Sequence, residues 1–253
     1  MASDSARPAL SIVIPAYNEE SRLPRTLDRI RDYLEPQSFS TEVIVVDDGS
    51  TDGTARIVTE RRAIWPALKL VTNPGNCGKG YSVRHGTLEA TGGIVLFTDA
   101  DLSAPIEEAG KLLAALETHD VAIGSRALDR SLIAVHESRF REFAGVVFNY
   151  IVRLVLWLPF ADTQCGFKAF HRERCRIIFE QQRVERFGFD PELLFLALRY
   201  GLTVAEVPVR WSHDPRTRVA MMRDSIRMFG EIWWIRWNAL IGRYPRLAKV
   251  QAP

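Results

Sequence analysis

Two aspartates separated by one residue, Asp99 and Asp101, directly follow the apolar segment 94–98. If this segment is a strand, side chains two positions apart leave its end on the same side. Two carboxylates placed in this way can hold one hard divalent cation that also binds phosphate oxygens. The spacing therefore predicts a cation site for a ligand that carries phosphate.

A second acidic pair, Asp47 and Asp48, follows the apolar segment 43–46 and opens the sequence DDGSTDG. The Ser-Thr-Asp part of this sequence suits the N-cap of a following helix. Capping does not require the first two carboxylates. We expect Asp47 and Asp48 to accept hydrogen bonds from the base or ribose of a nucleotide.

Glycines and two basic residues surround the expected start of a helix at 79–91. The sequence GNCGKG at 75–80 contains Lys79, and Arg84 lies about one turn further on. Because a helix N-terminus with nearby basic groups can approach phosphate, we expect Lys79 and Arg84 to bind the ligand's phosphates. The spacing matches neither the GxxxxGK[ST] phosphate loop nor the full dinucleotide fingerprint, which disfavours an ATPase and a dehydrogenase.

The elements that must position these residues alternate along the first 125 residues. Short, nearly continuous apolar runs predict strands at 10–15, 43–46, 68–71, 94–98 and 121–124, and helical spacing predicts helices at about 22–34, 53–64, 79–91 and 105–118. This alternation predicts a parallel sheet covered by helices on both faces. Ligands of such sheets bind beyond the carboxyl ends of the strands, where the acidic pairs lie.

The order of these motifs resembles glycosyltransferase family 2. The resemblance rests on IPAYNEE, VIVVDDGSTDGT, NPGNCGKGYSVRHG and LFTDADLS. Further on, DTQCGFKAF, FGFDPELLFLA and VAEVPVRW resemble the branch of dolichyl-phosphate glucosyltransferases and dolichol-phosphate mannose synthases. The resemblance covers about residues 10–230 and implies the α/β GT-A fold, a mostly parallel, Rossmann-like sheet flanked by helices.

The resemblance also implies a donor site. It places four residues around the base and ribose: Pro15, Tyr17, Glu19 and Asp47. Asp99 and Asp101 are expected to bind Mg²⁺ or Mn²⁺ bridging the diphosphate. Some mannose synthases have a metal-contacting Gln where this chain has Ser103, which leaves the third metal ligand open.

The acceptor site is expected from the second half of the chain. The resemblance assigns Arg126 and Arg139 to the acceptor and donor phosphates. It gives a weaker phosphate role to Arg216 and Arg218, which replace the usual Gly-Ser-Lys or Arg-x-Gly-x-Ser-Lys pattern. Three residues of DTQCGFK are expected to line the acceptor pocket: Asp162, Gln164 and Lys168. Alternatively, DTQCGF forms a buried turn, and FDPE begins a helix with Asp190 as its N-cap.

Charge is unevenly distributed along the 253 residues. The net charge is only +2, but residues 1–120 hold 12 basic and 18 acidic side chains, whereas residues 121–253 hold 21 and 13. A uniformly basic nucleic-acid binder is not built in this way. We expect the acidic half to hold the donor and its cation, and the basic half to meet an anionic acceptor.

Two long apolar segments, 143–161 and 226–244, raise the question of a membrane. The first contains Arg153 near its centre, which is costly for a helix that spans a bilayer. The second combines Trp and Arg in a way typical of a bilayer interface. We expect both to be amphipathic helices seated on a membrane surface, with a buried core helix as the alternative.

The cysteines and the first residues indicate the compartment. The three cysteines form no CxxC pair, and no His pair has metal-site spacing, which argues against a disulfide framework and a structural zinc. Residues 1–9 are polar and predict no secretory signal. We expect a cytoplasmic enzyme, peripheral on the cytoplasmic face of a membrane.

These expectations combine into one activity. We expect a metal-dependent, inverting transfer of a hexose, glucose before mannose, from a UDP- or GDP-linked donor to a polyprenyl or dolichyl phosphate. Asp101, Arg126 and Arg139 are expected to carry the reaction, with neither nucleic acid nor an obligatory protein partner. A lipid phosphate is already anionic near pH 7 and needs cations rather than a base.

Three alternatives remain. A saccharide hydroxyl acceptor would need a carboxylate base, for which Asp162 and Asp190 are candidates. A nucleotidyltransferase shares the sheet but normally has a Gly-rich, Arg-containing loop where this chain has PAYNEE. A nucleotide-sugar binding protein without activity is the third alternative.

The expected organisation is one catalytic domain at 10–222 between short tails at 1–9 and 246–253. Its donor half covers about 10–125, and its acceptor half about 126–222, including an amphipathic helix at about 140–160. A membrane-interface helix follows at 223–245.

Overall fold

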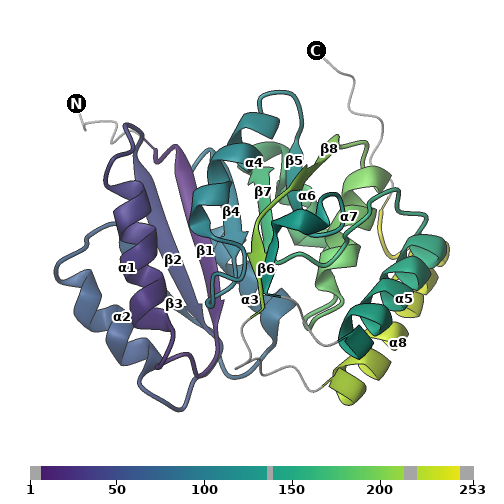
Figure 1. Ribbon diagram of the computed structural model, residues 1–253, viewed down its shortest axis with the longest axis horizontal. Coiled ribbons are helices and arrows are strands. Elements are labelled where there is room, and N and C mark those ends of the chain that lie inside the picture. The colour runs from purple at the N-terminus through teal and green to yellow at the C-terminus, as the bar shows by residue number, and fades with distance from the viewer. Residues whose placement is uncertain (1–6, 136–138, 214–220, 246–253) are drawn as a thin grey trace.

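A seven-stranded sheet forms the centre of the protein (Figure 1). The computed structural model describes residues 7–135, 139–213 and 221–245, with the backbone alone at 139–141 and 221–225. The strands lie in the order β3-β2-β1-β4-β7-β5-β8. Their bounds are β1 Leu10–Ala16, β2 Thr41–Asp47, β3 Leu68–Thr72, β4 Ile94–Thr98, β5 Val121–Ser125, β7 Phe167–His171 and β8 Val204–Pro208. A small parallel pair joins β6 (Ile133–Val135) and β9 (Trp211–Ser212).

Strand β7 alone among these seven runs antiparallel to its neighbours. It pairs with β4 on one side and with β5 on the other, whereas the remaining neighbours pair in parallel. Because β7 is reversed, its beginning, and not its end, lies at the edge where β4 and β5 end. The segment before Phe167 is therefore brought to the carboxyl edge of the parallel strands.

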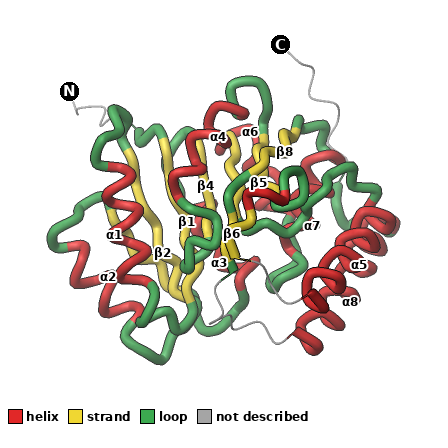
Figure 2. Tube along the Cα trace, in the orientation of Figure 1, coloured by secondary structure: helices red, strands yellow, loops and turns green. Residues whose placement is uncertain are grey.

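Helices cover both faces of the sheet, as Figure 2 shows in red. Their bounds are α1 Leu23–Leu34, α2 Thr54–Arg62, α3 Lys79–Glu89, α4 Ala109–Ala115, α5 Arg139–Leu156, α6 Arg172–Gln181, α7 Phe189–Arg199 and α8 Met221–Leu240, with single 3₁₀ turns at Ile106–Glu108 and Arg130–Leu132. Apolar side chains alternate along the strands. One set packs with α1, α2 and α4, and the other with α3 and α5 to α8.

The sequence-based prediction of a mostly parallel α/β sheet is confirmed. The five predicted strands are all present, with ends that differ by at most two residues. The last predicted helix of the first half is a 3₁₀ turn followed by the shorter α4. Asp190 is not the N-cap of α7: the helix begins at Phe189 after Gly188, and the carboxylate of Asp190 binds a buried lysine.

Helices α5 and α8 lie side by side at one end of the molecule (Figure 1). Their inward-facing residues join the core, whereas large apolar side chains face outward. These exposed residues are Phe143, Val146, Val147, Tyr150 and Leu154 on α5, and Ile226, Phe229, Trp233, Trp234, Trp237 and Leu240 on α8. Among the described residues, no helix is long and apolar enough to cross a bilayer. Because α5 and α8 pack side by side, these exposed side chains are together called here the α5–α8 face.

Trp157 extends this face directly after α5. Its side chain is 72% exposed, and the Arg236 guanidinium lies 4.0 Å from its ring centroid. Its φ of 56° is in the left-handed region, and the amide of Leu158 donates back to the carbonyl of Arg153. Glycine usually occupies this position at the end of a helix. An exposed tryptophan therefore stands where the backbone favours glycine.

Tyr244 ties the segment after α8 into the core. Its side chain is fully buried, and its hydroxyl donates to Oε1 of Glu192 at 2.5 Å. The same carboxylate accepts from the amides of Arg183 and Val184 at 2.8–3.1 Å. Burial raises the pKa of Glu192 to about 7, although these hydrogen bonds act in the opposite direction.

Candidate active site

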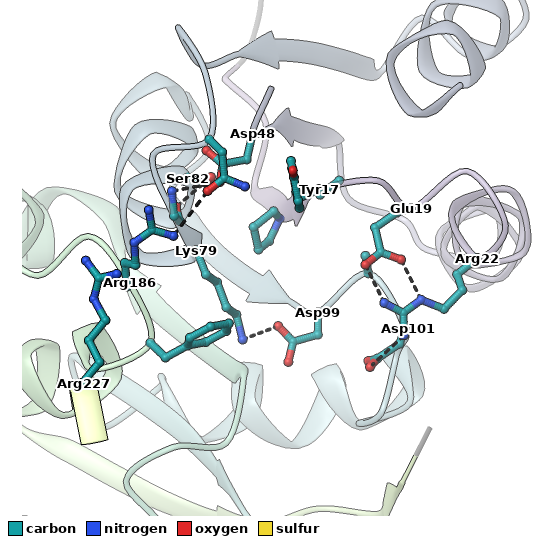
Figure 3. A pocket seen from close by; sticks show the side chains of 16 residues that line it. Tyr17, Glu19, Arg22, Asp48, Lys79, Ser82, Asp99, Asp101, Arg186 and Arg227 are labelled. Atoms are coloured by element: carbon teal, nitrogen blue, oxygen red, sulfur yellow. Dashed lines mark hydrogen bonds and ion pairs between the residues drawn. The ribbon is translucent and has the colours of Figure 1, made fainter. Parts of the chain in front are cut away.

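A cavity of about 650 Å³ opens at the carboxyl edge of β1, β2 and β4. Its size suits a small-molecule ligand. Seven of the predicted donor-site residues line it: Pro15, Tyr17, Glu19, Asp48, Lys79, Asp99 and Asp101. Figure 3 shows that their side chains come from three strand ends and from the start of α3. The strand order thus brings together residues that lie far apart in the sequence.

Asp99 lies between the side chain of Lys79 and the backbone of Gly166, the residue directly before β7. Its Oδ1 lies 2.6 Å from Nζ of Lys79. On the other side, a Cβ added to Gly166 would lie 2.3 Å from Oδ2 of Asp99. Burial lowers the pKa of Lys79, but attraction to Asp99, Asp190 and Asp101 more than offsets this and leaves the pKa above its ordinary value. Lys79 is therefore charged at neutral pH.

Asp101 is held by a backbone amide and faces an arginine. Its Oδ1 accepts from the amide of Ser103 at 2.9 Å, and its Oδ2 lies 3.8 Å from Nη1 of Arg22. Arg22 also forms a two-pronged ion pair with Glu19, with a distance of 2.6 Å from Nε to Oε2 (Figure 3). Burial, and then the charge of Asp99, raise the pKa of Asp101. Arg22 therefore links two predicted donor-site carboxylates.

Asp48 organises the loop that leads into α3. Its carboxylate accepts from the amides of Cys77 and Gly78 at 2.9 and 2.8 Å, and from the side chain of Asn73 at 2.7 Å. At Gly78 the φ is +109°, and a Cβ there would lie 2.4 Å from the carbonyl oxygen of Glu185. Neither the backbone nor the space accommodates a larger residue. These contacts place the following Lys79 in the cavity.

Two predicted donor-site residues lie away from the cavity wall. Asp47 is buried, and its Oδ1 accepts from the amide of Ser50 at 3.2 Å. Arg84 donates through Nε to the carbonyl of Phe179 at 3.0 Å. Five residues of helix turn the chain by 500°, so Arg84 points about 140° away from Lys79. Neither residue reaches the cavity in this structure.

Three of the predicted acceptor residues lie together at the end of β5: Arg126, Asp162 and Gln164. The guanidinium of Arg126 binds Asp162 through Nε at 2.6 Å and Nη2 at 2.9 Å, and lies 5.4 Å from the ring centroid of Trp211. The amide of Gln164 also donates to Asp162. Although burial raises the pKa of Asp162, its contacts with Arg126 and the Gln164 amide hold it at about 2. This carboxylate is therefore a poor proton acceptor.

Lys168, predicted to line the acceptor pocket, is fully buried in β7. Its ammonium donates to Oδ1 of Asp190 and to the carbonyl of Cys165, both at 2.5 Å. It also lies 5.5 Å from the ring centroid of Phe97. This ion pair is buried, and neither of its residues lines the cavity described above.

Three predicted arginines have no described side chain. Arg139 begins α5, but its side chain lies outside the described atoms, and Arg216 and Arg218 lie outside the described residues. Their predicted phosphate contacts stay predictions.

The cavity also contains residues that the sequence did not indicate. Ser82 and Asn76 come from the region of α3, Arg186 and Phe187 precede α7, and Arg227 lies on α8. Glu19 and Arg22 lie three residues apart, and this spacing could have indicated their ion pair from the sequence. For Arg186 and Arg227 no local motif exists, because tertiary packing alone brings them to the donor motifs.

The described residues contain no group of three or more His, Cys, Asp or Glu side chains placed to hold a metal ion. Magnesium nevertheless often uses one or two carboxylates and completes its shell with water and substrate phosphates. Asp99 and Asp101 meet this requirement, since both line the cavity. The donor set fits a cation that arrives with a phosphate ligand.

Comparison with known proteins agrees with the geometry of this site. The family described as Glycosyl transferase family 2 matches residues 11–176. The chain belongs to this glycosyltransferase family. It is therefore a glycosyltransferase, and the motifs that suggested the family lie around one cavity.

Curated relatives of this chain include several dolichyl-phosphate beta-glucosyltransferases. Dolichyl-phosphate beta-glucosyltransferases from Drosophila melanogaster, Trichomonas vaginalis and Homo sapiens are 38%, 36% and 34% identical to the chain. The alignments cover 98%, 83% and 95% of this chain and 80%, 67% and 79% of those proteins, respectively. The likeness therefore extends over both halves of the chain.

Solved structures confirm the GT-A fold. Glucosyl-3-phosphoglycerate synthase from Mycobacterium tuberculosis in complex with UDP has a TM-score of 0.64 at 23% identity, and covers 91% of this chain and 80% of its own. Its complex with Mn²⁺, UDP and glucosyl-3-phosphoglycerate has a TM-score of 0.62 at 23% identity, with coverage of 94% and 80%. At this identity the likeness establishes the fold alone.

Proposed function

We propose that this glycosyltransferase moves glucose from UDP-glucose to a polyprenyl phosphate such as dolichyl phosphate at a membrane surface. The names of the relatives support the glucosyl group and the dolichyl phosphate acceptor. The UDP complexes of the structural neighbours support the donor base. GDP-mannose is the competing donor.

The observation that carries the proposal is that α8 contributes side chains both to the cavity and to the α5–α8 face. Arg227 lines the cavity, whereas Phe229, Trp233 and Trp237 of the same helix belong to the exposed α5–α8 face. An acceptor with a phosphate head and a lipid tail needs both surfaces close together. Trp and Arg side chains are enriched at bilayer interfaces. The enzyme therefore docks peripherally, with the α5–α8 face on the lipid and the cavity next to it.

The donor half supplies the binding site for the nucleotide sugar. Tyr17 and Asp48 lie on the side of the cavity proposed for the base and ribose, and Asp99 and Asp101 would hold Mg²⁺ or Mn²⁺ at the diphosphate. When bound, the cation neutralises charge on the departing diphosphate. Lys79, Arg186 and Arg227 supply further positive charge around the same cavity.

The acceptor phosphate needs no catalytic base. A phosphate monoester is anionic near pH 7, and an oxygen of the acceptor attacks the anomeric carbon while the bond to the nucleoside diphosphate breaks. Attack from the opposite side inverts the anomeric centre, so an α-linked donor gives a β-linked product. Arg126 is proposed to bind the acceptor phosphate, exchanging part of its contact with Asp162 for the ligand.

Transfer to a saccharide hydroxyl is disfavoured by the state of its candidate bases. Asp162, with its pKa of about 2, is paired with Arg126, and Asp190 is buried against Lys168. A general base works best when its pKa lies near the working pH and it can reach the hydroxyl. Neither carboxylate satisfies both conditions.

The experiment is a transfer assay with purified full-length protein. UDP-[¹⁴C]glucose or GDP-[¹⁴C]mannose is incubated with Mg²⁺ and phosphatidylcholine vesicles, with and without dolichyl phosphate. We expect label in the lipid phase with UDP-glucose and dolichyl phosphate, a β-linked product by NMR, and loss of at least a hundredfold in rate for Asp101→Asn. No lipid label with either donor, or full activity of Asp101→Asn, would overturn the proposal.

The location on the cytoplasmic face also belongs to this proposal. The three cysteines are free thiols, which suits a reducing compartment. Oriented vesicles that carry dolichyl phosphate in their outer leaflet are the matching substrate for the assay.

A further inference from the structure

Lys79 occupies the position at which a cation is needed in the predicted metal site. Its Nζ lies 2.6 Å from Oδ1 of Asp99, and the two side chains are 22% and 32% exposed. Gly166 closes the other side of the carboxylate, because even a Cβ would lie 2.3 Å from Oδ2. Asp99 is therefore held between its own ammonium partner and the backbone.

Two further residues interact with Lys79: Phe189 and Asp190. Lys79 is the first residue of α3, and its ammonium lies 5.9 Å from the ring centroid of Phe189. The neighbouring Asp190 attracts it but is already bound to the buried Lys168 at 2.5 Å. Lys79 thus reaches the cavity from the first turn of α3, and Figure 3 shows the ammonium pointing to Asp99.

A divalent cation that binds alone meets this ammonium as a like charge. Binding at Asp99 would either displace Lys79 from its partner or place two cations against one carboxylate, and both are unfavourable. A nucleotide diphosphate changes this balance, because its oxygens offer the displaced ammonium a new partner. The diphosphate also supplies the ligands that two carboxylates leave open.

We propose that Lys79 is a tethered counter-cation that keeps the divalent metal from binding until the nucleotide arrives, and that it then moves from Asp99 to the diphosphate. The proposal rests on the donor site proposed above. It assigns Lys79 a positioning role before the reaction as well as a contact with the donor. Metal and nucleotide accordingly bind with strong mutual dependence.

The test measures Mn²⁺ binding without any turnover. Free Mn²⁺ is quantified by electron paramagnetic resonance in titrations of the wild type, Lys79→Met and Lys111→Met, each with and without UDP. Lys111 is the matched control, since it loses an ion pair with Glu108 outside the cavity. Without UDP, we expect Lys79→Met to bind Mn²⁺ at least tenfold more tightly than the wild type, and Lys111→Met to equal the wild type.

Adding UDP should reduce or reverse this advantage, because the wild type regains an ammonium contact with the diphosphate that the variant lacks. Asp99→Asn in the Lys79→Met background should abolish the gain, which locates the ion. Equal or weaker Mn²⁺ binding by Lys79→Met without UDP overturns the proposal. If Lys79→Met does not fold, Lys79→Gln is measured in its place against the same criterion.

The failure of the donor assignment has a separate signature. In that case UDP leaves Mn²⁺ binding by the wild type unchanged, whereas the comparison without UDP still reports on Lys79 and Asp99. The effect of UDP on the wild type therefore tests the donor assignment, and the comparison of variants without UDP tests the role of Lys79.

Discussion

The buried carboxyl of Glu192 predicts a loss of stability as the pH rises through the neutral range. Its pKa is raised from an ordinary 4.5 to about 7 by burial. The folded state therefore holds a proton that the unfolded state has already released, and its contribution to stability is complete below pH 4.5 and lost as the pH rises through 7. The difference of 2.5 pKa units corresponds to about 3 kcal/mol.

The measurement is urea unfolding at fixed ionic strength from pH 5 to 8.5, for the wild type and Glu192→Gln. The variant keeps an oxygen for the amides of Arg183 and Val184, and its amide group can donate to the hydroxyl of Tyr244. It cannot ionise. The difference in unfolding free energy between the two proteins should change by about 3 kcal/mol over this range, because the wild type loses stability relative to Glu192→Gln as the pH rises.

Comparing the two proteins cancels the titration of the histidines, which both share. Tyr244→Phe provides a second check, because the hydroxyl of Tyr244 lowers the pKa of Glu192. Its removal should move the midpoint of the wild-type change to higher pH. Parallel curves for the wild type and Glu192→Gln between pH 5 and 8.5 would refute the assignment of this proton to Glu192.

Two further predictions concern Trp157 and Glu42. Trp157→Ala and Trp157→Gly should both weaken binding to anionic vesicles in flotation assays. The Gly variant should nevertheless be about 1 kcal/mol more stable than the Ala variant, because a left-handed backbone disfavours side chains. Equal stability of the two variants would contradict the strain at this residue. Burial raises the pKa of Glu42, but hydrogen bonds from Lys69, Ser11 and Thr91 lower it to about 2. The ionised carboxylate therefore stabilises the folded state above pH 4.5, and this stabilisation is lost as the pH falls through 2. Glu42→Gln should remove about 3 kcal/mol of acid dependence in unfolding between pH 5 and 2, and an unchanged acid transition would show that this network is not responsible.

The first half of the fold was predictable because its strands are nearly continuous apolar runs. Strands 10–16, 41–47 and 94–98 are buried on both faces, which is the pattern expected for a parallel sheet. Strand β7 escaped prediction because Lys168 lies in its middle. A lysine in a short segment reads as a surface residue, and its burial depends on Asp190, which is 22 residues away in sequence.

The candidate site was predictable where each residue follows a strand. Asp99 and Asp101 came from the spacing alone, since a strand end dictates where both carboxylates point. The same reasoning could not predict which of Asp47 and Asp48 faces the cavity, because this depends on the backbone conformation where the strand passes into the loop. Arg227 could not be found at all, because its position depends on how α8 packs against the domain.

The reversed strand β7 also sets the order in which the protein can be built during synthesis. Strand β5 pairs with β7 and β8, both of which leave the ribosome after it, and β4 has an open edge until residues 167–171 appear. A nascent chain of about 130 residues therefore holds a three-layered donor half with an unpaired apolar strand edge. Residues 10–125 do not form the complete sheet by themselves, because the segment that brings Gly166 to Asp99 leads into β7, which pairs with both β4 and β5. Fragments or fusions cut between residues 126 and 166 should be prone to edge-to-edge association.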